Sequence, residues 1–238
     1  MLRAATVLAV VLSCAPSAQA QSLASLVTEL PSDFAHLISV DSAIALGGAG
    51  LVSWPLHNND DAIAQRLRLD ADGTGELFDA GNVVGDGSVQ VAGALGVYIL
   101  GWARHAPRAQ RVGADLFRAQ VVNGVLTRGL KLAVERTRPD GGSRSFPSGH
   151  ASAAFATAAV LQKHFGWKAG GPAYAVAAYV ASARLTSYHH FASDVAFGAG
   201  LGVAAGRATT FRVHRQRVAI APSVARDHVA VGVTVGAD

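Results

Sequence analysis

The sequence RSFPSGHASA, residues 144–153, joins a turn to the start of a helix. Ser148 is a preferred N-cap residue, and the small residues that follow His150 favour a helix. Gly149 allows the backbone to come close to a ligand, and His150 falls in the first helical turn. Because free N–H groups and the positive end of the helix dipole lie at such a position, an anion is favoured there. The stretch predicts either a capped helix with a surface histidine or an anion site beside a proton donor.

Helical patterns flank this stretch on both sides. A helix is expected over 113–137, ended by Pro139, because its apolar residues recur at spacings of three and four. These residues are Phe117, Val121, Val122, Val125, Leu126 and Leu130. Further helices are expected over 88–103, 149–164, 172–185 and 194–208. Residues 21–85 are expected to form shorter helices, one of them capped by Asp60 or Asp61.

The last part of the chain has a different pattern. Val229, Val231, Val233 and Val235 alternate with small or polar residues, and RVAIAP (217–222) precedes them across a short polar turn. This alternation predicts a β-hairpin. The expected fold class is therefore mainly α, a helical bundle with a C-terminal β-hairpin.

The N-terminus has the pattern of an export signal. Arg3 is followed by an apolar run over 4–12 and by a small-x-small cleavage site at 18–20. Cys14 loosely resembles the cysteine of a lipoprotein signal, but Leu12 is larger than such signals usually have. Cleavage after Ala20 is therefore expected, which leaves a periplasmic or secreted chain without cysteine.

The composition excludes some classes of protein. Hydrophobic residues make up 50% of the chain and charged residues 15%, so a large core is expected and disorder is not. The formal net charge of +4 is spread along the chain, which argues against nucleic-acid binding and weakly favours an anionic substrate or a membrane surface. The apolar stretches at 89–103, 150–161, 172–183 and 195–206 are shorter than the ~20 residues of a spanning helix. A soluble helical core with peripheral membrane contact is expected.

Two further clusters accompany residues 144–153. Lys131 and Arg138 lie seven residues apart, so both cations would point the same way from one helix. Arg184 is followed by His190 and Asp194, and Asp194 could receive the Nδ1–H of His190 and leave Nε2 free as a nucleophile. Each cluster alone is more often a solvated helix face or a structural hydrogen bond. Their occurrence in order within residues 131–194 favours one anion site.

The three clusters resemble the signature of the type 2 phosphatidic acid phosphatase superfamily, which includes class A acid phosphatases and vanadium haloperoxidases. The family pattern is K-x6-R-P, then P-S-G-H, then S-R-x5-H-x3-D. It is met here by Lys131, Arg138 and Pro139, by Pro147, Ser148, Gly149 and His150, and by Arg184, His190 and Asp194. Ala183 stands where the family usually has serine, which puts any role of that hydroxyl in doubt. The resemblance covers about residues 86–208.

The resemblance implies a helical bundle of this family's type and a phosphatase that needs neither metal nor cofactor. His190 would attack phosphorus, Asp194 would orient His190, and His150 would protonate the leaving group. The phosphate oxygens would be held by Lys131, Arg138, Ser148, Gly149 and Arg184. The substrate would be a phosphomonoester or a pyrophosphate ester, with lipid phosphates included. The expected organisation is a signal peptide (1–20), an N-terminal helical segment (21–85), a catalytic core (86–208) and the hairpin extension (209–238).

Three alternatives remain open on sequence alone. A metal site could use His150, His189, His190 and Asp194, but three nearby cations would weaken metal binding. A haloperoxidase could hold vanadate with the same residues, although this chain is short for one. A non-catalytic envelope protein could use the hairpin as a binding edge.

Overall fold

Helix α8 (Gly149–Phe165) begins where the sequence 144–153 predicts, in a computed structural model of the chain. Ser148 occupies the N-cap position with extended backbone angles, φ −70° and ψ 114°, but its side chain makes no capping hydrogen bond. The helix ends at Gly166, whose φ of 70° favours glycine. The structure describes residues 22–69, 75–210, 216–225 and 228–237. The predicted signal peptide lies outside these residues.

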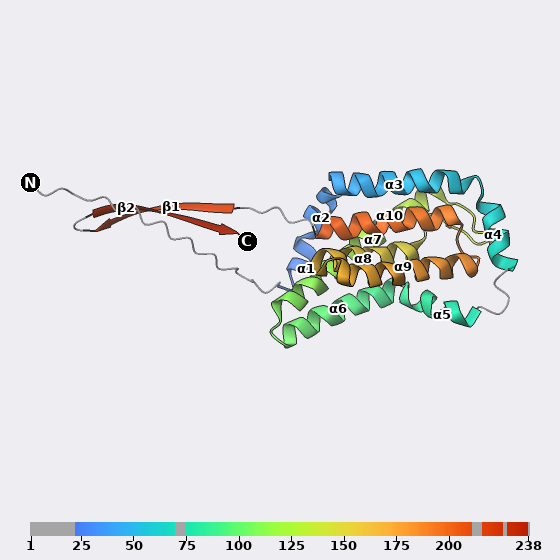
Figure 1. The fold of residues 1–238 in the computed structure, drawn as a ribbon, viewed down its shortest axis with the longest axis horizontal. Coiled ribbons are helices and arrows are strands. Elements are labelled where there is room, and N and C mark those ends of the chain that lie inside the picture. The colour runs from blue at the N-terminus through green and yellow to red at the C-terminus, as the bar shows by residue number, and fades with distance from the viewer. Residues whose placement is uncertain (1–21, 70–74, 211–215, 226–227, 238) are drawn as a thin grey trace, which may run out of the picture. The chain divides into compact units, whose positions relative to one another are not determined.

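The other helices confirm the mainly helical prediction (Figure 1). They are α1 (Ser25–Thr28), α2 (Leu30–His36), α3 (Val40–His57), α4 (Asp60–Leu69), α5 (Gly75–Val84), α6 (Gly87–Ala103), α7 (Pro107–Val134), α9 (Trp167–Thr186) and α10 (Ala192–Thr209). In Figure 1, α3 covers one side of α10, while α5 and α6 lie on the opposite side of the bundle. These helices belong to one compact unit, residues 20–211.

Helix α7 differs from its prediction at both ends. It begins at Pro107, a residue that suits the first turn because its missing N–H would have no partner there. It ends at Val134, before Glu135, whose φ of 48° is left-handed. Arg138 therefore lies beyond the helix, in a turn where its N–H donates to the Gly142 carbonyl at 2.8 Å. The prediction that Lys131 and Arg138 point the same way from one helix is wrong.

Helices α8 and α10 touch along a row of glycines spaced four residues apart, which places them on one helix face. A Cβ atom at Gly202 would lie 2.1 Å from the Ser152 carbonyl oxygen, and one at Gly198 would lie 2.6 Å from that of Ser148. Only glycine therefore allows this approach of the two backbones. The Ser148 N–H also donates to the Asp194 carbonyl at 3.0 Å, which joins the start of α8 to the start of α10.

The core is built mainly from small apolar residues where α6, α7 and α8 meet. It contains Ala94, Val112, Leu116, Ala119, Ala156 and Val160. The apolar face predicted for 113–137 is only partly buried, since Val122 is fully buried but Val125 is 55% exposed. The physical reason is that Val125 borders a cavity instead of a packed helix.

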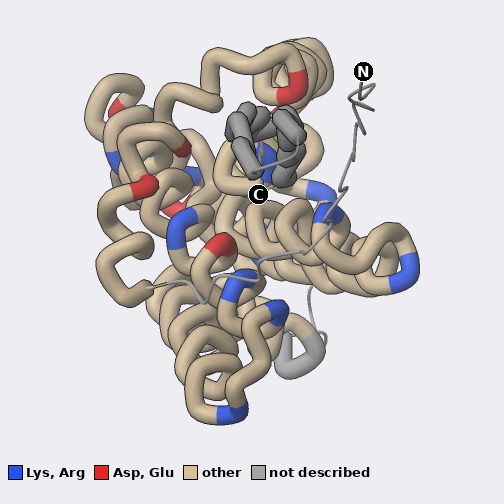
Figure 2. Tube along the Cα trace, turned by 90° about the vertical axis from the view of Figure 1, so that its left-hand side faces the viewer, with Lys and Arg blue, Asp and Glu red and all other residues tan. Residues whose placement is uncertain are grey.

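The outer helices expose many large apolar side chains. On α3 these are Val40, Ile44, Leu51, Val52 and Trp54, and on α6 they are Val89, Val97, Ile99, Leu100 and Trp102. Figure 2 shows long stretches of helix without Lys, Arg, Asp or Glu. Within the described residues, no single helix is both long and apolar enough to cross a membrane, although two sharply bent pairs, 25–57 and 78–103, pass by length and composition. This surface is more apolar than the expected soluble bundle would carry.

The C-terminal residues form two antiparallel strands, β1 (Gln216–Ala225) and β2 (His228–Ala237). Val224 pairs with Val229 and Ala225 with His228. The strands belong to a unit separate from the helices.

Candidate active site

The predicted site residues come from four places in the fold that meet at one end of the bundle. Lys131 lies in the last turn of α7, while Arg138 and Ser148 lie in the loop between α7 and α8. Gly149 and His150 begin α8. The remaining three, Arg184, His190 and Asp194, follow one another from the end of α9 to the start of α10.

The charges of these residues act on one another. The pKa of Lys131 is lowered to about 8, first by burial and then by the nearby Arg138 and Arg184 guanidinium groups. Burial followed by the charge of Arg184 lowers the pKa of His150 to about 4. Three cations so close together repel one another unless an anion lies between them.

His190 and Asp194, the predicted pair, lie close together, and both are almost completely buried. His190 Nδ1 lies 3.7 Å from Asp194 Oδ2, which is too long for the predicted hydrogen bond, so that bond is not formed in this structure. Burial lowers the pKa of His190 to about 4, although Asp194 opposes this shift. Burial by itself would raise the pKa of Asp194, but the contacts with His190 and Ser145 outweigh it and hold that pKa below its usual value. His190 is therefore neutral and Asp194 ionised at neutral pH.

Several buried polar atoms around the site have no hydrogen-bond partner within the described part of the chain. They are Arg138 Nε, Arg184 Nε, Ser148 Oγ and His190 Nδ1. Buried polar atoms are rarely left unpaired, because the loss of water costs about 1–3 kcal/mol for each. Arg138 Nε, Arg184 Nε and Ser148 Oγ, gathered beside a helix N-terminus, match the oxygens of a tetrahedral oxyanion.

Residues 113–217 match the PAP2 superfamily.

This part of the chain, residues 113–217, belongs to the PAP2 superfamily.

Three known proteins are similar to the chain in sequence or in fold. A lipid A 1-phosphatase of Porphyromonas gingivalis is 34% identical over 99 residues, which are 39% of this chain and 22% of the length of that relative. The crystal structure of Aquifex aeolicus LpxE is 22% identical with a TM-score of 0.51, and the match covers 61% of this chain and 92% of that one. A transmembrane PAP2 type phosphatidylglycerolphosphate phosphatase from Bacillus subtilis is 21% identical with a TM-score of 0.55, over 78% of this chain and 92% of that one. Both structures support the helical fold and give no support to the C-terminal hairpin.

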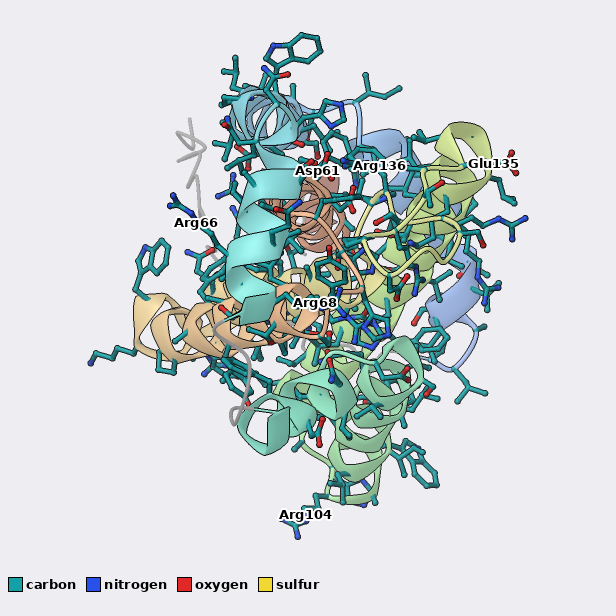
Figure 3. The ribbon with its side chains drawn as sticks, turned by 90° about the vertical axis from the view of Figure 1, so that its right-hand side faces the viewer. Asp61, Arg66, Arg68, Arg104, Glu135 and Arg136 are labelled. Carbon is teal, nitrogen blue, oxygen red and sulfur yellow. The ribbon has the colours of Figure 1, made fainter. Side chains whose placement is uncertain are left out.

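Arg136 is a residue of the PAP2 site that the sequence patterns missed. Its Nη1 lies 2.7 Å from Asp194 Oδ1 and its Nη2 lies 2.8 Å from Asp60 Oδ2. The guanidinium carbon stands 4.1 Å above the centre of the Phe191 ring. Figure 3 shows Glu135 at the edge of the bundle and Arg136 further inside it. Arg136 thus bridges the Asp194 carboxylate to the N-terminal helices.

Asp60 and Ser145 complete this arrangement. Asp60 is one of the two residues predicted to cap a helix, but its side chain accepts hydrogen bonds from the Ser193 N–H at 3.0 Å, from the Ser193 hydroxyl and from Arg136. Ser145 donates its hydroxyl to Asp194, which also accepts the Phe191 N–H at 2.9 Å. A signal for Arg136 was present, since it lies between Lys131 and Arg138. Nothing near Asp60 in the sequence pointed to a residue 76 positions later.

His189 is held differently from His190. Its Nδ1 lies 2.7 Å from the Ser187 carbonyl oxygen, which ties its ring to the loop backbone. Among the described residues, no group of three or more His, Cys, Asp or Glu side chains is arranged to hold a metal ion. The alternative metal site of His150, His189, His190 and Asp194 is therefore not formed in this PAP2 structure.

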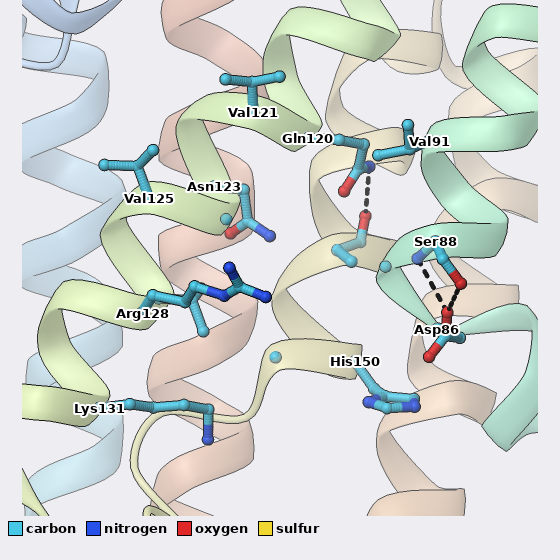
Figure 4. A pocket seen from close by; sticks show the side chains of 15 residues that line it. Asp86, Ser88, Val91, Gln120, Val121, Asn123, Val125, Arg128, Lys131 and His150 are labelled. Carbon is cyan, nitrogen blue, oxygen red and sulfur yellow. Dashed lines mark hydrogen bonds between the residues drawn. The ribbon is translucent and has the colours of Figure 1, made fainter.

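A cavity of about 750 Å³ opens beside the site, between α6, α7 and α8 (Figure 4). Lys131, Gly149 and His150 line one end of it. In Figure 4 the opposite end is bordered by Gln120, Val121 and Val91. The cavity is continuous with the place where the oxyanion would bind.

Proposed function

We propose that this PAP2 protein is a metal-independent phosphatase that hydrolyses phosphate esters through a phosphohistidine intermediate. The observation that supports this proposal most directly is the set of buried, unpaired donors around a neutral His190. Lys131, Arg138 and Arg184 would neutralise the equatorial phosphate oxygens, whose charge is largest in the transition state. Ser148 Oγ and the Gly149 N–H would complete the oxyanion site.

The reaction would proceed in two displacements. His190 Nε2 attacks phosphorus, the P–O bond to the leaving group breaks, and His150 gives its proton to the departing oxygen. His150 then takes a proton from water, the hydroxide attacks the phosphohistidine, and the P–N bond breaks to release phosphate and neutral His190. Asp194 stabilises the positive charge that His190 carries while phosphorylated.

The protonation states suit these roles. A pKa of about 4 leaves His190 neutral and nucleophilic at neutral pH. His150 has a pKa of about 4 without a bound anion, and a phosphate dianion beside it raises this pKa and favours the proton-donating form. The nearby Asp86 carboxylate acts in the same direction.

We propose lipid phosphates as the substrates. The names of the relatives refer to lipid A and to phosphatidylglycerolphosphate, both of which are lipids. The apolar side chains exposed on α3 and α6 would contact the membrane that holds such substrates. Export by the signal peptide at 1–20 would place the enzyme in the periplasm at the membrane surface.

The test is hydrolysis of p-nitrophenyl phosphate by the full chain in excess EDTA, with His190→Ala and His189→Ala as a matched pair. We expect activity in EDTA, its loss in His190→Ala by a factor of about 10³ or more, and its retention in His189→Ala. Enzyme denatured in alkaline detergent during turnover of ³²P-labelled substrate should carry one phosphate on nitrogen, detected as a ³²P label that is stable in base and lost in acid. Activity abolished by EDTA would overturn the metal-independent mechanism. Bromide oxidation in vanadate and peroxide, without phosphate release, would favour the haloperoxidase instead.

A further inference from the structure

One face of α7 forms the polar wall of the cavity beside His150. Gln120, Asn123, Thr127 and Lys131 follow one another at spacings of three, four and four residues, so they lie in a row along that face. The row runs from the interior of the bundle to the oxyanion site at Lys131. Any ester whose phosphate lies at Lys131 could extend its leaving group along this row.

Two members of the row already have partners within the protein. Gln120 Nε2 donates to the Ala153 carbonyl and to Thr157 Oγ1, each at 3.0 Å. The hydroxyl oxygens of Thr127 and Ser152 are 3.2 Å apart and share a hydrogen bond. These two residues therefore fasten α7 to α8 and have no need of a ligand.

Asn123 is different. Its side chain is 3% exposed, and its Oδ1 has no hydrogen-bond partner within the described part of the chain. Figure 4 shows the amide at the cavity, between the levels of Gln120 and Arg128. An unpaired amide oxygen in a buried position is costly unless a ligand donates to it.

Most of the rest of the wall is apolar, with Asp86 and Ser88 as polar residues on the α6 side. Val91, Val121, Val125 and Ala153 supply apolar surface, whereas Arg128, Lys131 and His150 lie toward the phosphate end. The volume of about 750 Å³ is in the range of small-molecule sites, about 300–1,000 Å³. A charged head at the rim and an apolar body inside match an amphiphile.

We propose that this cavity binds the leaving group of an amphiphilic phosphate ester and that Asn123 selects leaving groups with a hydroxyl or amide N–H donor. Asn123 precedes Lys131 by eight residues, so the donor would lie about 12 Å along α7 from the phosphate end. This proposal rests on the phosphatase activity proposed above. It adds a specificity-determining residue that lies outside the three motifs.

The experiment compares two esters of equal length, decyl phosphate and 10-hydroxydecyl phosphate, whose extended chains have a similar reach to the distance from Lys131 to Asn123. The quantity measured is the ratio of kcat/KM for the hydroxylated ester to that for the plain ester. Asn123→Leu, which keeps the size of the side chain and removes its polarity, should lower this ratio about 10- to 100-fold, because the hydroxyl loses its buried partner. A ratio that stays within about twofold of the wild-type value would overturn the role of Asn123.

A second variant tests the cavity without touching a polar group. Gly124 lines the cavity, and a Cβ atom there meets nothing within 4 Å, so Gly124→Leu places a side chain into open space. We expect kcat/KM for decyl phosphate to fall at least about tenfold more than that for p-nitrophenyl phosphate. Gly129→Leu is the matched control, since Gly129 lies on the same helix, is equally open and does not line the cavity. It should leave the hydrolysis of all three esters unchanged.

The outcomes separate this proposal from the general one. If the wild type hydrolyses p-nitrophenyl phosphate but Gly124→Leu lowers kcat/KM equally for decyl phosphate and p-nitrophenyl phosphate, only the leaving-group site is overturned. Failure of the wild-type chain to hydrolyse any of the three esters would overturn the proposed function and this site with it.

Discussion

The Asp194 carboxylate is held by Arg136, a residue outside the three sequence motifs. Arg136 contacts Asp194 and Asp60 at 2.7 and 2.8 Å. We regard Arg136 as a positioning residue that keeps the carboxylate ionised and turned toward His190. Charge-assisted contacts of this kind are about twice as strong as neutral hydrogen bonds.

Arg136→Lys should therefore lower kcat about tenfold with little change in KM, and Arg136→Ala should lower it further. Lysine retains the charge but cannot contact both carboxylates as the guanidinium fork does. Because Arg136 helps to lower the pKa of Asp194, its removal should also move the acid limb of the kcat–pH profile to higher pH. The kinetic constants and the kcat–pH profile can both be measured with p-nitrophenyl phosphate.

The exposed Arg104→Ala serves as the control for the loss of an arginine. A rise in KM at unchanged kcat in the Arg136 variants would place Arg136 in substrate binding and contradict a positioning role. An unshifted acid limb would contradict it as well.

The burial of His190 predicts a pH dependence of stability. Its pKa is about 4 in the folded chain and about 6.5 in the unfolded chain, so the unfolded state binds the proton first as pH falls. The stabilisation is complete above pH 6.5 and is lost as pH falls toward 4, amounting to about 3 kcal/mol over that range. Asp33 acts in the opposite sense. Burial raises its pKa to about 6, so its contribution to the stability of the folded chain is lost as pH rises through 6.

The measurement is the free energy of unfolding by urea at pH 4.5, 5.5 and 7 for the wild type and for His190→Gln. As pH falls, the free energy of unfolding of the variant should decrease less steeply than that of the wild type, by about 1 kcal/mol per pH unit. Parallel curves for the wild type and His190→Gln would refute this assignment.

At the scale of elements, the contact between α8 and α10 determines where the residues of the site lie relative to one another. Gly198 and Gly202 allow the helix backbones to touch, and this contact fixes the Ser148 N-cap against the start of α10. Ser148 and Asp194 belong to different motifs, so the helix packing brings two parts of the signature together.

Gly202→Ala should accordingly destabilise the chain by about 1–3 kcal/mol, because the added methyl group would lie 2.1 Å from the Ser152 carbonyl oxygen. The comparison is Gly93→Ala in α6, where nothing lies within 4 Å and alanine should stabilise by about 0.5–1 kcal/mol. Thermal denaturation followed by circular dichroism distinguishes the two. A Gly202→Ala variant as stable as Gly93→Ala would show that the helices can separate without cost.

For the whole molecule, the apolar surface of α3 and α6 is the main departure from a soluble bundle. Leu51 is 79% exposed and Trp54 is 78% exposed on one turn of α3, and Trp102 is 65% exposed on α6. Burial of one such side chain in lipid is worth about 1.5–3 kcal/mol.

The double variant Leu51→Gln, Trp54→Gln should therefore reduce binding to vesicles of phosphatidylethanolamine and phosphatidylglycerol by about tenfold or more. The fraction of protein that floats with the vesicles in a density gradient is the measurement. Asp61→Asn, an exposed polar exchange on α4, is the control. Wild-type protein that stays at the bottom of the gradient without detergent would contradict membrane contact.

The sequence by itself determined the helical class, three of the helices to within a few residues, and the family. The helices around 87–103, 149–165 and 192–209 were predictable because capping residues and apolar spacing are properties of a short segment. The PAP2 motifs were recognisable because phosphate chemistry requires cations, a nucleophile and a proton donor, and each motif keeps these residue types at a fixed spacing. The role of each motif residue stays a prediction.

Only the tertiary structure decided how these segments meet. Arg138 left the helix because Glu135 takes a left-handed conformation, which the local pattern did not indicate. Arg136 contacts partners 58 and 76 residues away, and the unpaired oxygen of Asn123 matters only because α6 and α8 leave a cavity beside it. Local patterns depend on neighbouring residues, whereas ion pairs and cavities depend on distances that exist only after the chain has folded.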